Sequence, residues 1–310
     1  MYQTYHQPQH TAGFRPVPGG PLPVISPSPM IRDVWADNLE EEFKVIRELA
    51  EEYPYVAMDT EFPGVVLKAV GHFSAAHEHY YQSLRLNVNA LKIIQVGITL
   101  LNEKGEVPDK CCTWQFNFHF CVQDDVYAVD SIEMLKLGGL NFDYFDSHGI
   151  DMHLFSDLLY SSGLVMNPRI KWIVFHGGFD FAYLVKGLRN ENMPENEEAF
   201  LQVFHKLFPS MYDVKYLLRL TDVMPNAGLD YLAEYLSVKR LGTAHQAGSD
   251  SLMTGHCFFK LIRDKFPKGL PDTANGVLFN LIEDPVSTGN TPMTPYNTGA
   301  SQFPSSPASR

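Results

Sequence analysis

The chain has 310 residues, 45% of them hydrophobic and 13% aromatic, which is enough to build one large core or two ordinary ones. With 24 Lys plus Arg against 36 Asp plus Glu, its net charge is −12, which argues against a protein that grips nucleic acid through a broad basic surface. No apolar run approaches the roughly 20 residues that cross a bilayer, so we expect no membrane association. Four cysteines without a CxxC pair, and an N-terminus without an apolar signal core, indicate a reducing compartment, the cytoplasm or the nucleus.

The two ends of the chain differ in composition from its middle. Residues 1–30 contain seven prolines and no acidic residue, and residues 283–310 contain five prolines and nine Ser or Thr. Neither segment can bury enough apolar surface to offset the entropy lost on ordering, so we predict two disordered tails. No repeat or long linker divides the chain between them, and residues 31–270 are predicted to form one domain.

Hydrophobic periodicity predicts a helix and then three strands at the start of this domain. Residues 38–51 carry apolar side chains at helical spacing behind a cap at Asp37 or Asn38. The strands that follow, rich in aromatic and β-branched residues, are predicted at residues 53–62, 93–101 and 112–120. The polar segment at residues 102–106 contains glycine and suits a hairpin turn, so these strands are predicted to pair antiparallel.

The pattern changes to alternating helices and short strands in the second half of the domain. Helices are predicted at residues 129–137, 152–161, 179–189, 196–207, 214–220, 228–236 and 249–265. Strands at residues 171–175 and 211–214 would pair in parallel through helical crossovers. Antiparallel strands continued by parallel ones, with helices on both faces, make a mixed α/β sheet, and this order of elements is that of the ribonuclease H-like architecture.

An acidic pair lies at the end of the first predicted strand. Asp59 and Glu61 are two residues apart, so their side chains point to the same face of the strand and can share a cation. A solvated polar edge is the alternative interpretation. The apolar residues on either side, among them Met58 and Phe62, place the pair in apolar surroundings, where carboxylates need a cation.

A third carboxylate, that of Asp180, follows the strand at residues 171–175. It comes after Gly177 and Gly178, in the first turn of a predicted helix. An acid at this position is often only a helix cap or a partner of the helix dipole. Two glycines permit close backbone approach, however, and the end of a sheet strand is where ligands are usually held, which favours a site.

A fourth carboxylate, that of Asp250, opens the last predicted helix five residues after His245. Asp250, or Ser249 in its place, would be an N-cap in the alternative interpretation, and a lone His is more often structural. Together with the three other carboxylates, Asp250 could gather two hard cations roughly 3.5 to 4 Å apart, while His245 takes the proton of a metal-bound water. This combination is typical of a metal-dependent phosphodiesterase.

The order of these motifs resembles that of the DEDD exonuclease superfamily in its histidine-bearing branch. The matching stretches are Asp-Thr-Glu at residues 59–61, His-Gly-Gly-Phe-Asp at 176–180 and His-Gln-Ala-Gly-Ser-Asp at 245–250. Residues 55–66, 83–88 and 113–118 further resemble the POP-type deadenylases, the catalytic exoribonucleases of the CCR-NOT complex. The resemblance implies 3′ to 5′ hydrolysis of the poly(A) tail of messenger RNA to AMP, which starts mRNA decay and silencing.

The same resemblance implies a role for each site residue. Asp59 would bridge two metal ions, Glu61 and Asp250 would complete the first metal site, and Asp180 would help to hold the second. His245 would orient or deprotonate the attacking water. Mg²⁺ is the expected ion, and Mn²⁺ could replace it. The implied partners are poly(A) RNA, a NOT scaffold protein and a second deadenylase subunit.

Other polar and aromatic residues near these motifs have alternative interpretations. Phe62 would stack on the terminal base of the substrate, or else pack in the core. The insertion at residues 65–92 contains His72, His77 and His79, but no cysteine accompanies them, and we favour exposed histidines over a zinc site. For Asp213 we predict a helix cap and not a metal ligand.

Two other functions share part of this pattern. A scaffold subunit with weak or lost catalysis would keep the fold while losing a carboxylate or the histidine, and all five residues are present. A proofreading or processing exonuclease would share the site but should lack the segments at residues 83–88 and 113–118. We therefore predict an exoribonuclease.

Overall fold

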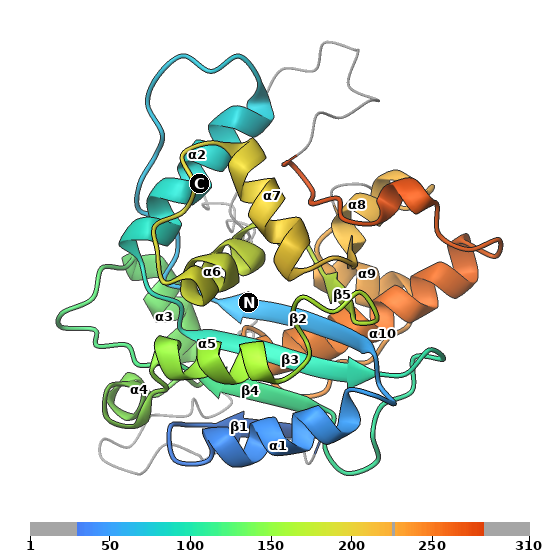
Figure 1. Ribbon diagram of the computed structural model, residues 1–310, viewed down its shortest axis with the longest axis horizontal. Helices are drawn as coiled ribbons and strands as arrows, with labels where there is room; N and C mark the ends of the chain where they lie inside the picture. Colours follow the sequence, from blue (N-terminus) through green and yellow to red (C-terminus); the bar gives the residue numbers. More distant parts are fainter. Residues whose placement is uncertain (1–29, 225–226, 282–310) are drawn as a thin grey trace, which may run out of the picture.

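A mixed sheet of six strands forms the middle of the molecule (Figure 1). The computed structural model describes residues 30–224 and 227–281. The strands are β1 (Ile31–Val34), β2 (Tyr55–Glu61), β3 (Gln95–Leu101), β4 (Thr113–Asn117), β5 (Lys171–Val174) and β6 (Met211–Asp213), in the order β1-β4-β3-β2-β5-β6. β3 pairs antiparallel with β2 and β4, whereas β5 pairs parallel with β2 and β6. The predicted ribonuclease H-like mixed sheet is thus confirmed.

The edge strand β1 was not predicted. It has only four residues and pairs in parallel with β4. Such a short segment has no periodicity of its own, and its strand conformation comes from pairing with a partner that lies about 80 residues further along the chain.

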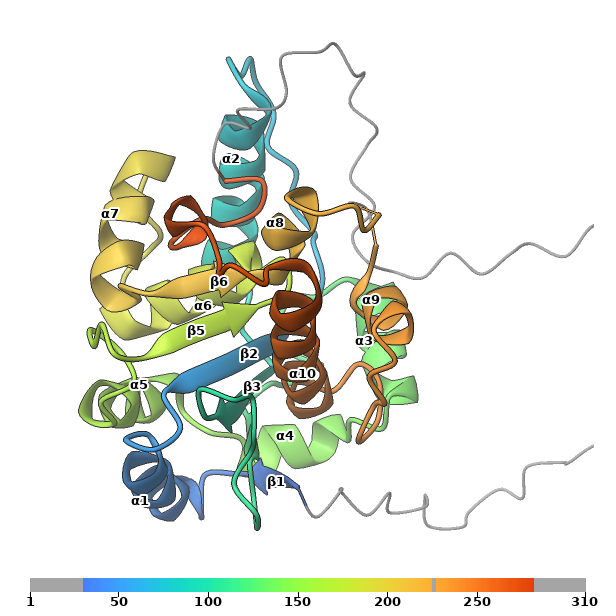
Figure 2. The same ribbon diagram turned by 90° about the vertical axis from the view of Figure 1, so that its right-hand side faces the viewer.

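Helices cover both faces of the sheet. Figure 2 shows α10 (Ala247–Lys265) on one side and a row of helices on the other. That row consists of α1 (Leu39–Leu49), α5 (Met152–Ser161), α6 (Gly178–Arg189) and α7 (Glu197–Leu207). The remaining helices are α2 (Ala76–Ala90), α3 (Val129–Leu137), α4 (Phe142–His148), α8 (Val214–Arg219) and α9 (Leu229–Tyr235).

The sheet separates two apolar cores, and the alternation of β2 determines which side chains enter each. Val56 and Met58 belong to the larger core, beneath α1, α5 and α6. Ala57 belongs to the smaller core, with α8, α9 and α10. Asp59 and Glu61 share the alternation of Ala57, so both point to the face that α10 covers.

The insertion between β2 and β3 contains α2, which was not predicted. His77 and His79 lie on this helix, where His77 Nε2 is 3.9 Å from the Glu197 carboxylate. In the described part of the chain, neither of them, nor His72, belongs to a group with the spacing of metal ligands. The structure therefore gives no support to zinc at these histidines. The short helix α4, which was also not predicted, is rich in aromatic residues and packs with α3 in a small apolar cluster.

The packed part of the chain continues beyond residue 270. Leu278 and Leu281 are buried in the larger core. The predicted tails, residues 1–30 and 283–310, lie outside the described residues except for Met30. No helix within the described ranges combines the length and the apolar character that crossing a membrane requires.

Candidate active site

Asp59 and Glu61 stand at the end of β2, opposite Gly97 and Gln95 of β3. Glu61 is buried and Asp59 is half-buried. One carboxylate oxygen of each, together with one of Asp250, lie within 4.8 Å of one another. These three carboxylates, from two elements far apart in the sequence, form an oxygen-only group of the kind that holds a hard divalent cation.

α10 reaches the strand carboxylates because the sheet beneath it presents small residues. A Cβ atom on Gly97 would lie 1.9 Å from the carbonyl oxygen of Ala247, so only glycine allows the first turn of α10 to lie here. Further along, the Thr99 and Ser251 hydroxyls are 2.8 Å apart. The backbone of α10 therefore lies directly on β3, which brings Asp250 to the end of β2.

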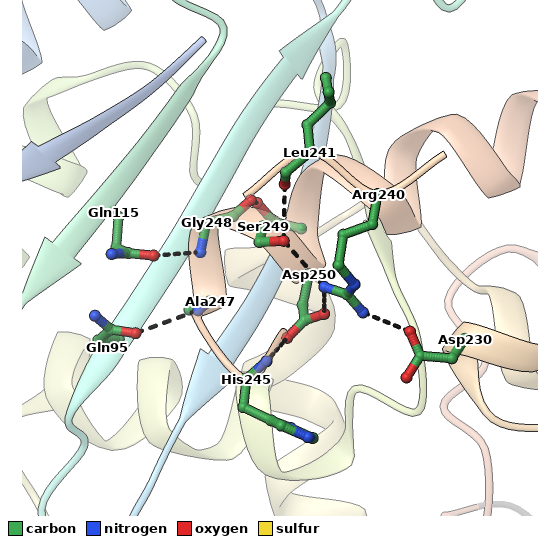
Figure 3. A network of polar contacts seen from close by, with 11 residues as sticks. Gln95, Gln115, Asp230, Arg240, Leu241, His245, Ala247, Gly248, Ser249 and Asp250 are labelled. Carbon is green, nitrogen blue, oxygen red and sulfur yellow. Dashed lines mark hydrogen bonds and ion pairs between the residues drawn. The ribbon is translucent and has the colours of Figure 1, made fainter. Parts of the chain in front are cut away.

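The start of α10 is capped from the sheet. The helix begins at Ala247, and the side chain of Gln246 at the N-cap makes no capping hydrogen bond. Instead, the amide oxygen of Gln95 accepts from the Ala247 N–H at 3.2 Å, and that of Gln115 accepts from the Gly248 N–H at 3.0 Å (Figure 3). The prediction that the helix opens at Asp250 is wrong, and so is the cap alternative for Asp250 or Ser249. The residues that replace the cap come from β3 and β4.

Both carboxylate oxygens of Asp250 have a hydrogen-bond donor. Arg240 Nη1 donates to Oδ1 at 2.5 Å, and the backbone N–H of His245 donates to Oδ2 at 3.1 Å. His245 has φ = 60°, a left-handed conformation that residues other than glycine adopt infrequently. Its N–H faces Asp250 while its imidazole extends away from that carboxylate (Figure 3). The structure thus brings His245 and Asp250 together through the backbone.

Asp180 lies in the first turn of α6 and is buried. The preceding glycines are closely packed, because a Cβ atom on Gly177 would lie 2.4 Å from Val174 Cγ2 and one on Gly178 would lie 2.6 Å from Tyr80 Oη. This close packing agrees with the expectation from the double glycine.

Thr60 and Asp213 hold Asp180 and the turn before it. Thr60 Oγ1 donates to Asp180 Oδ1 at 2.5 Å. Asp213 accepts from the Lys215 N–H at the start of α8, which confirms it as a helix cap, and it also accepts from the N–H groups of His176 and Gly177. Asp213 therefore fixes the turn that leads to Asp180.

Burial and the charges of neighbouring carboxylates raise the pKa values of the acidic residues in this site. Burial and the neighbouring charges of Asp180, Asp250 and Glu61 raise the pKa of Asp59 well above its ordinary value. Burial, followed by Asp250 and Asp180, does the same to the pKa of Glu61, and burial raises the pKa of Asp180 to about 7. Arg240 acts in the opposite direction on Asp59, Glu61 and Asp250. Such a set of oxygen donors, short of positive charge, fits divalent cations.

Phe62 lies beside these carboxylates and packs on the larger core. Its ring stacks on that of Phe179, with centroids 5.0 Å apart, and lies 5.5 Å from the ring of Tyr183. The side chain is only half-buried, so base stacking by Phe62 stays a prediction.

No motif in the sequence pointed to a role in the site for Thr60, Gln95, Gln115 or Arg240. A buried amide within an apolar strand needs a hydrogen-bond partner, and this signal was available for Gln95 and Gln115. Arg240 precedes Asp250 by ten residues in a loop and belongs to no pattern that local sequence could reveal.

Comparisons with known proteins agree on one family. A family model described as CAF1 family ribonuclease matches residues 34–154 and 153–258. The poly(A) ribonuclease pop2 of Schizosaccharomyces pombe is 46% identical over 250 residues, which cover 80% of this chain and 73% of that protein. The structure of S. pombe Pop2p in its Mg²⁺- and Mn²⁺-bound form matches with a TM-score of 0.79 and 44% identity, over 82% of this chain and 100% of that one. A chain in the structure of the yeast NOT1 MIF4G domain co-crystallised with CAF1 also matches, with a TM-score of 0.69 and 34% identity. The match covers 80% of this chain and 96% of that one.

Proposed function

The chain belongs to the CAF1 family of ribonucleases, and from this premise we propose that it is a poly(A)-specific 3′ to 5′ exoribonuclease that hydrolyses the tail of messenger RNA to AMP. The observation that carries the proposal is the convergence of Asp59, Glu61 and Asp250 within 4.8 Å, with Asp180 near enough for its charge to act on Asp59 and with the His245 N–H bonded to Asp250. The choice of poly(A) is supported by the S. pombe relative, which is a poly(A) ribonuclease. Shortening of the tail would start mRNA decay and silencing.

The proposal includes two divalent ions as cofactors. Asp59, Glu61 and Asp250 would hold one ion, and Asp59 with Asp180 would hold the other. Carboxylate oxygens suit Mg²⁺ and Mn²⁺, and both ions are bound in the related Pop2p structure. When bound, such a pair lowers the pKa of water and neutralises the charge that develops on the scissile phosphate.

The protein side chains would supply proton transfer and orientation. The left-handed backbone of His245 and the bond from its N–H to Asp250 hold this residue beside the carboxylates, and its imidazole would accept the proton of the attacking water, a step worth about 10² to 10⁴ in rate. Thr60 would keep Asp180 in place. Phe62 would stack on the terminal base, which contributes about 1 to 3 kcal/mol in other nucleic-acid complexes.

The proposed partners are poly(A) RNA, a NOT scaffold protein and a second deadenylase subunit, in the cytoplasm and the nucleus. Support for the scaffold comes from the related CAF1 that was co-crystallised with the NOT1 MIF4G domain. The net charge of −12 also favours recruitment to RNA by a partner over strong binding by the isolated chain.

The test is hydrolysis of 5′-labelled RNAs that end in A, U or C tails, with Mg²⁺ or Mn²⁺. We expect shortening one nucleotide at a time, AMP as product and the fastest reaction on A tails. Asp180→Ala should abolish the reaction without loss of helix content, whereas Asp222→Ala, an exposed carboxylate paired with Lys265, should leave it unchanged. Full activity in EDTA would contradict the metal site. Equal rates on all three tails would contradict poly(A) specificity alone.

A further inference from the structure

Arg240 lies in the loop between α9 and α10, and its guanidinium contacts three side chains. Nη1 donates to Asp250 Oδ1 at 2.5 Å and to Ser249 Oγ at 3.0 Å. Nη2 donates to Asp230 Oδ1 of α9 at 2.7 Å. Figure 3 shows the guanidinium between Asp250 and Asp230, so that it connects α9 to the first turn of α10.

The backbone beside Arg240 is fixed to the same turn of α10. Ser249 Oγ, which accepts from Arg240, donates to the carbonyl oxygen of Leu241 at 2.8 Å. Gly242 has φ = +86°, and a Cβ atom there would lie 3.1 Å from Ser249 Cβ. The guanidinium is therefore anchored at both ends, by the backbone that carries it and by Asp230.

Arg240 determines how the Asp250 carboxylate is oriented. With Arg240 on Oδ1 and the His245 N–H on Oδ2, the plane of the carboxylate is fixed. Each oxygen can accept at two positions, so one position on each remains for a cation. The planar guanidinium binds Asp250 through one nitrogen and Asp230 through the other, which fixes the orientation of the Asp250 carboxylate. The single ammonium nitrogen of a lysine cannot contact both carboxylates in this arrangement.

The positive charge of Arg240 would also repel a bound cation, and this effect opposes the benefit of orientation. The guanidinium is paired with the carboxylates of both Asp230 and Asp250, which offset part of its field, although its charge still acts on Asp59 and Glu61. A substitution that keeps the positive charge but removes the contact through two nitrogens separates the two effects. Residues that orient metal ligands typically change metal affinity about 10- to 100-fold when they are substituted.

We propose that Arg240 is a positioning residue of the metal site, which orients Asp250 toward Asp59 and Glu61 and thereby sets the affinity for a divalent ion. The inference rests on the proposed metal site but not on the choice of poly(A) as substrate.

The experiment measures Mn²⁺ binding to the full chain without RNA, by the electron paramagnetic resonance signal of free Mn²⁺. Arg240→Lys keeps the positive charge but removes the contact of two guanidinium nitrogens with Asp250 and Asp230. It should weaken Mn²⁺ binding about 10- to 100-fold. Asp230→Ala removes the far anchor, on a side chain that is 73% exposed, and should weaken binding by a smaller factor. Arg263→Lys is the matched control, an exposed arginine of α10 paired with Asp264, and should bind as the unaltered chain does.

The outcomes separate this inference from the proposed function. Unaltered Mn²⁺ affinity in Arg240→Lys, or tighter binding in Arg240→Gln, would overturn the inference and leave Arg240 as a counter-ion only. If Arg240→Lys fails to fold, Asp230→Ala decides, and wild-type affinity in that variant would overturn the inference. If Arg240→Lys weakens Mn²⁺ binding while the unaltered chain does not hydrolyse A-tailed RNA, the positioning role is supported and the deadenylase proposal is contradicted.

Discussion

The carboxylates of the site are held in two different ways. Asp59 and Glu61 belong to β2, whose hydrogen-bonded pairing with β3 and alternation of side chains fix where both carboxylates point. Asp180 and Asp250 stand at the starts of helices, and their positions depend on a hydroxyl, two amides and a guanidinium from other elements. The strand residues are positioned locally, whereas the helix residues are positioned by tertiary contacts. Substitutions far from the carboxylates should therefore disturb Asp250 and Asp180 more than Asp59 and Glu61.

Removal of a strand carboxylate should have the largest effect. Asp59→Asn should slow hydrolysis by about 10³-fold or more, since metal ions contribute several kcal/mol to the transition state and each 1.36 kcal/mol is tenfold. In EDTA the same variant should unfold at a higher temperature than the unaltered chain, because a source of repulsion is gone. Activity assays and thermal denaturation check both expectations, and an active Asp59→Asn variant would refute the role of this residue.

Displacement of α10 should come next in size. Gly97→Ala places a methyl group against the Ala247 carbonyl, and overpacking of this kind typically costs about 1 to 3 kcal/mol of stability. Mn²⁺ affinity should fall as well, because Asp250 moves with the helix. Gly228→Ala, at the N-cap of α9 where nothing lies within 4 Å of the added Cβ atom, is the control; it should lower stability less than Gly97→Ala does, through the weaker N-cap preference of Ala, and should change Mn²⁺ affinity little. Similar effects of the two variants would contradict the close-approach argument.

The pH dependence of stability should reveal Asp180. Because burial raises its pKa from 3.8 to about 7, the folded chain holds a proton there that the unfolded chain releases. The contribution of Asp180 is therefore full below pH 4 and is lost as the pH rises toward and through 7, with a slope of at most about 1.4 kcal/mol per pH unit. Urea denaturation in EDTA between pH 5 and 8 should show a shallower fall in Asp180→Asn, and identical slopes would contradict this assignment.

Loss of one amide cap should have the smallest effect. Gln95→Met removes the acceptor of the Ala247 N–H and the donor to Asn117 Oδ1, and the two lost hydrogen bonds should together cost about 1 to 2 kcal/mol. Mn²⁺ affinity should fall modestly, since α10 keeps its second amide contact from Gln115. An exposed glutamine, Gln202 on α7, serves as the control in Gln202→Met. Equal stability of the two variants would show that capping from the sheet is dispensable.

The same contrast explains which parts of the molecule could be predicted. The alternation of β2 is local, so the shared face of Asp59 and Glu61 followed from the sequence. The capping role of Asp213 also followed, since its partner at Lys215 lies two residues away. The start of α10 did not follow, because its caps are contributed by strands about 130 to 150 residues earlier in the chain.

Elements that depend on partners distant in sequence were missed for a related reason. β1 is too short to have a periodic pattern, and it exists as a strand because β4 offers it an edge. Arg240 has no motif, and its importance is visible only once α9 and α10 stand side by side. The sequence therefore predicted the ligands of the candidate site better than the residues that position them.

The central claim, that four carboxylates from three parts of the chain hold two divalent ions, is tested most directly by anomalous diffraction from crystals grown with Mn²⁺. We predict two manganese peaks, one in contact with Asp59, Glu61 and Asp250 and the other in contact with Asp59 and Asp180. Crystals without manganese at these carboxylates, from protein that still shortens A-tailed RNA, would contradict the account.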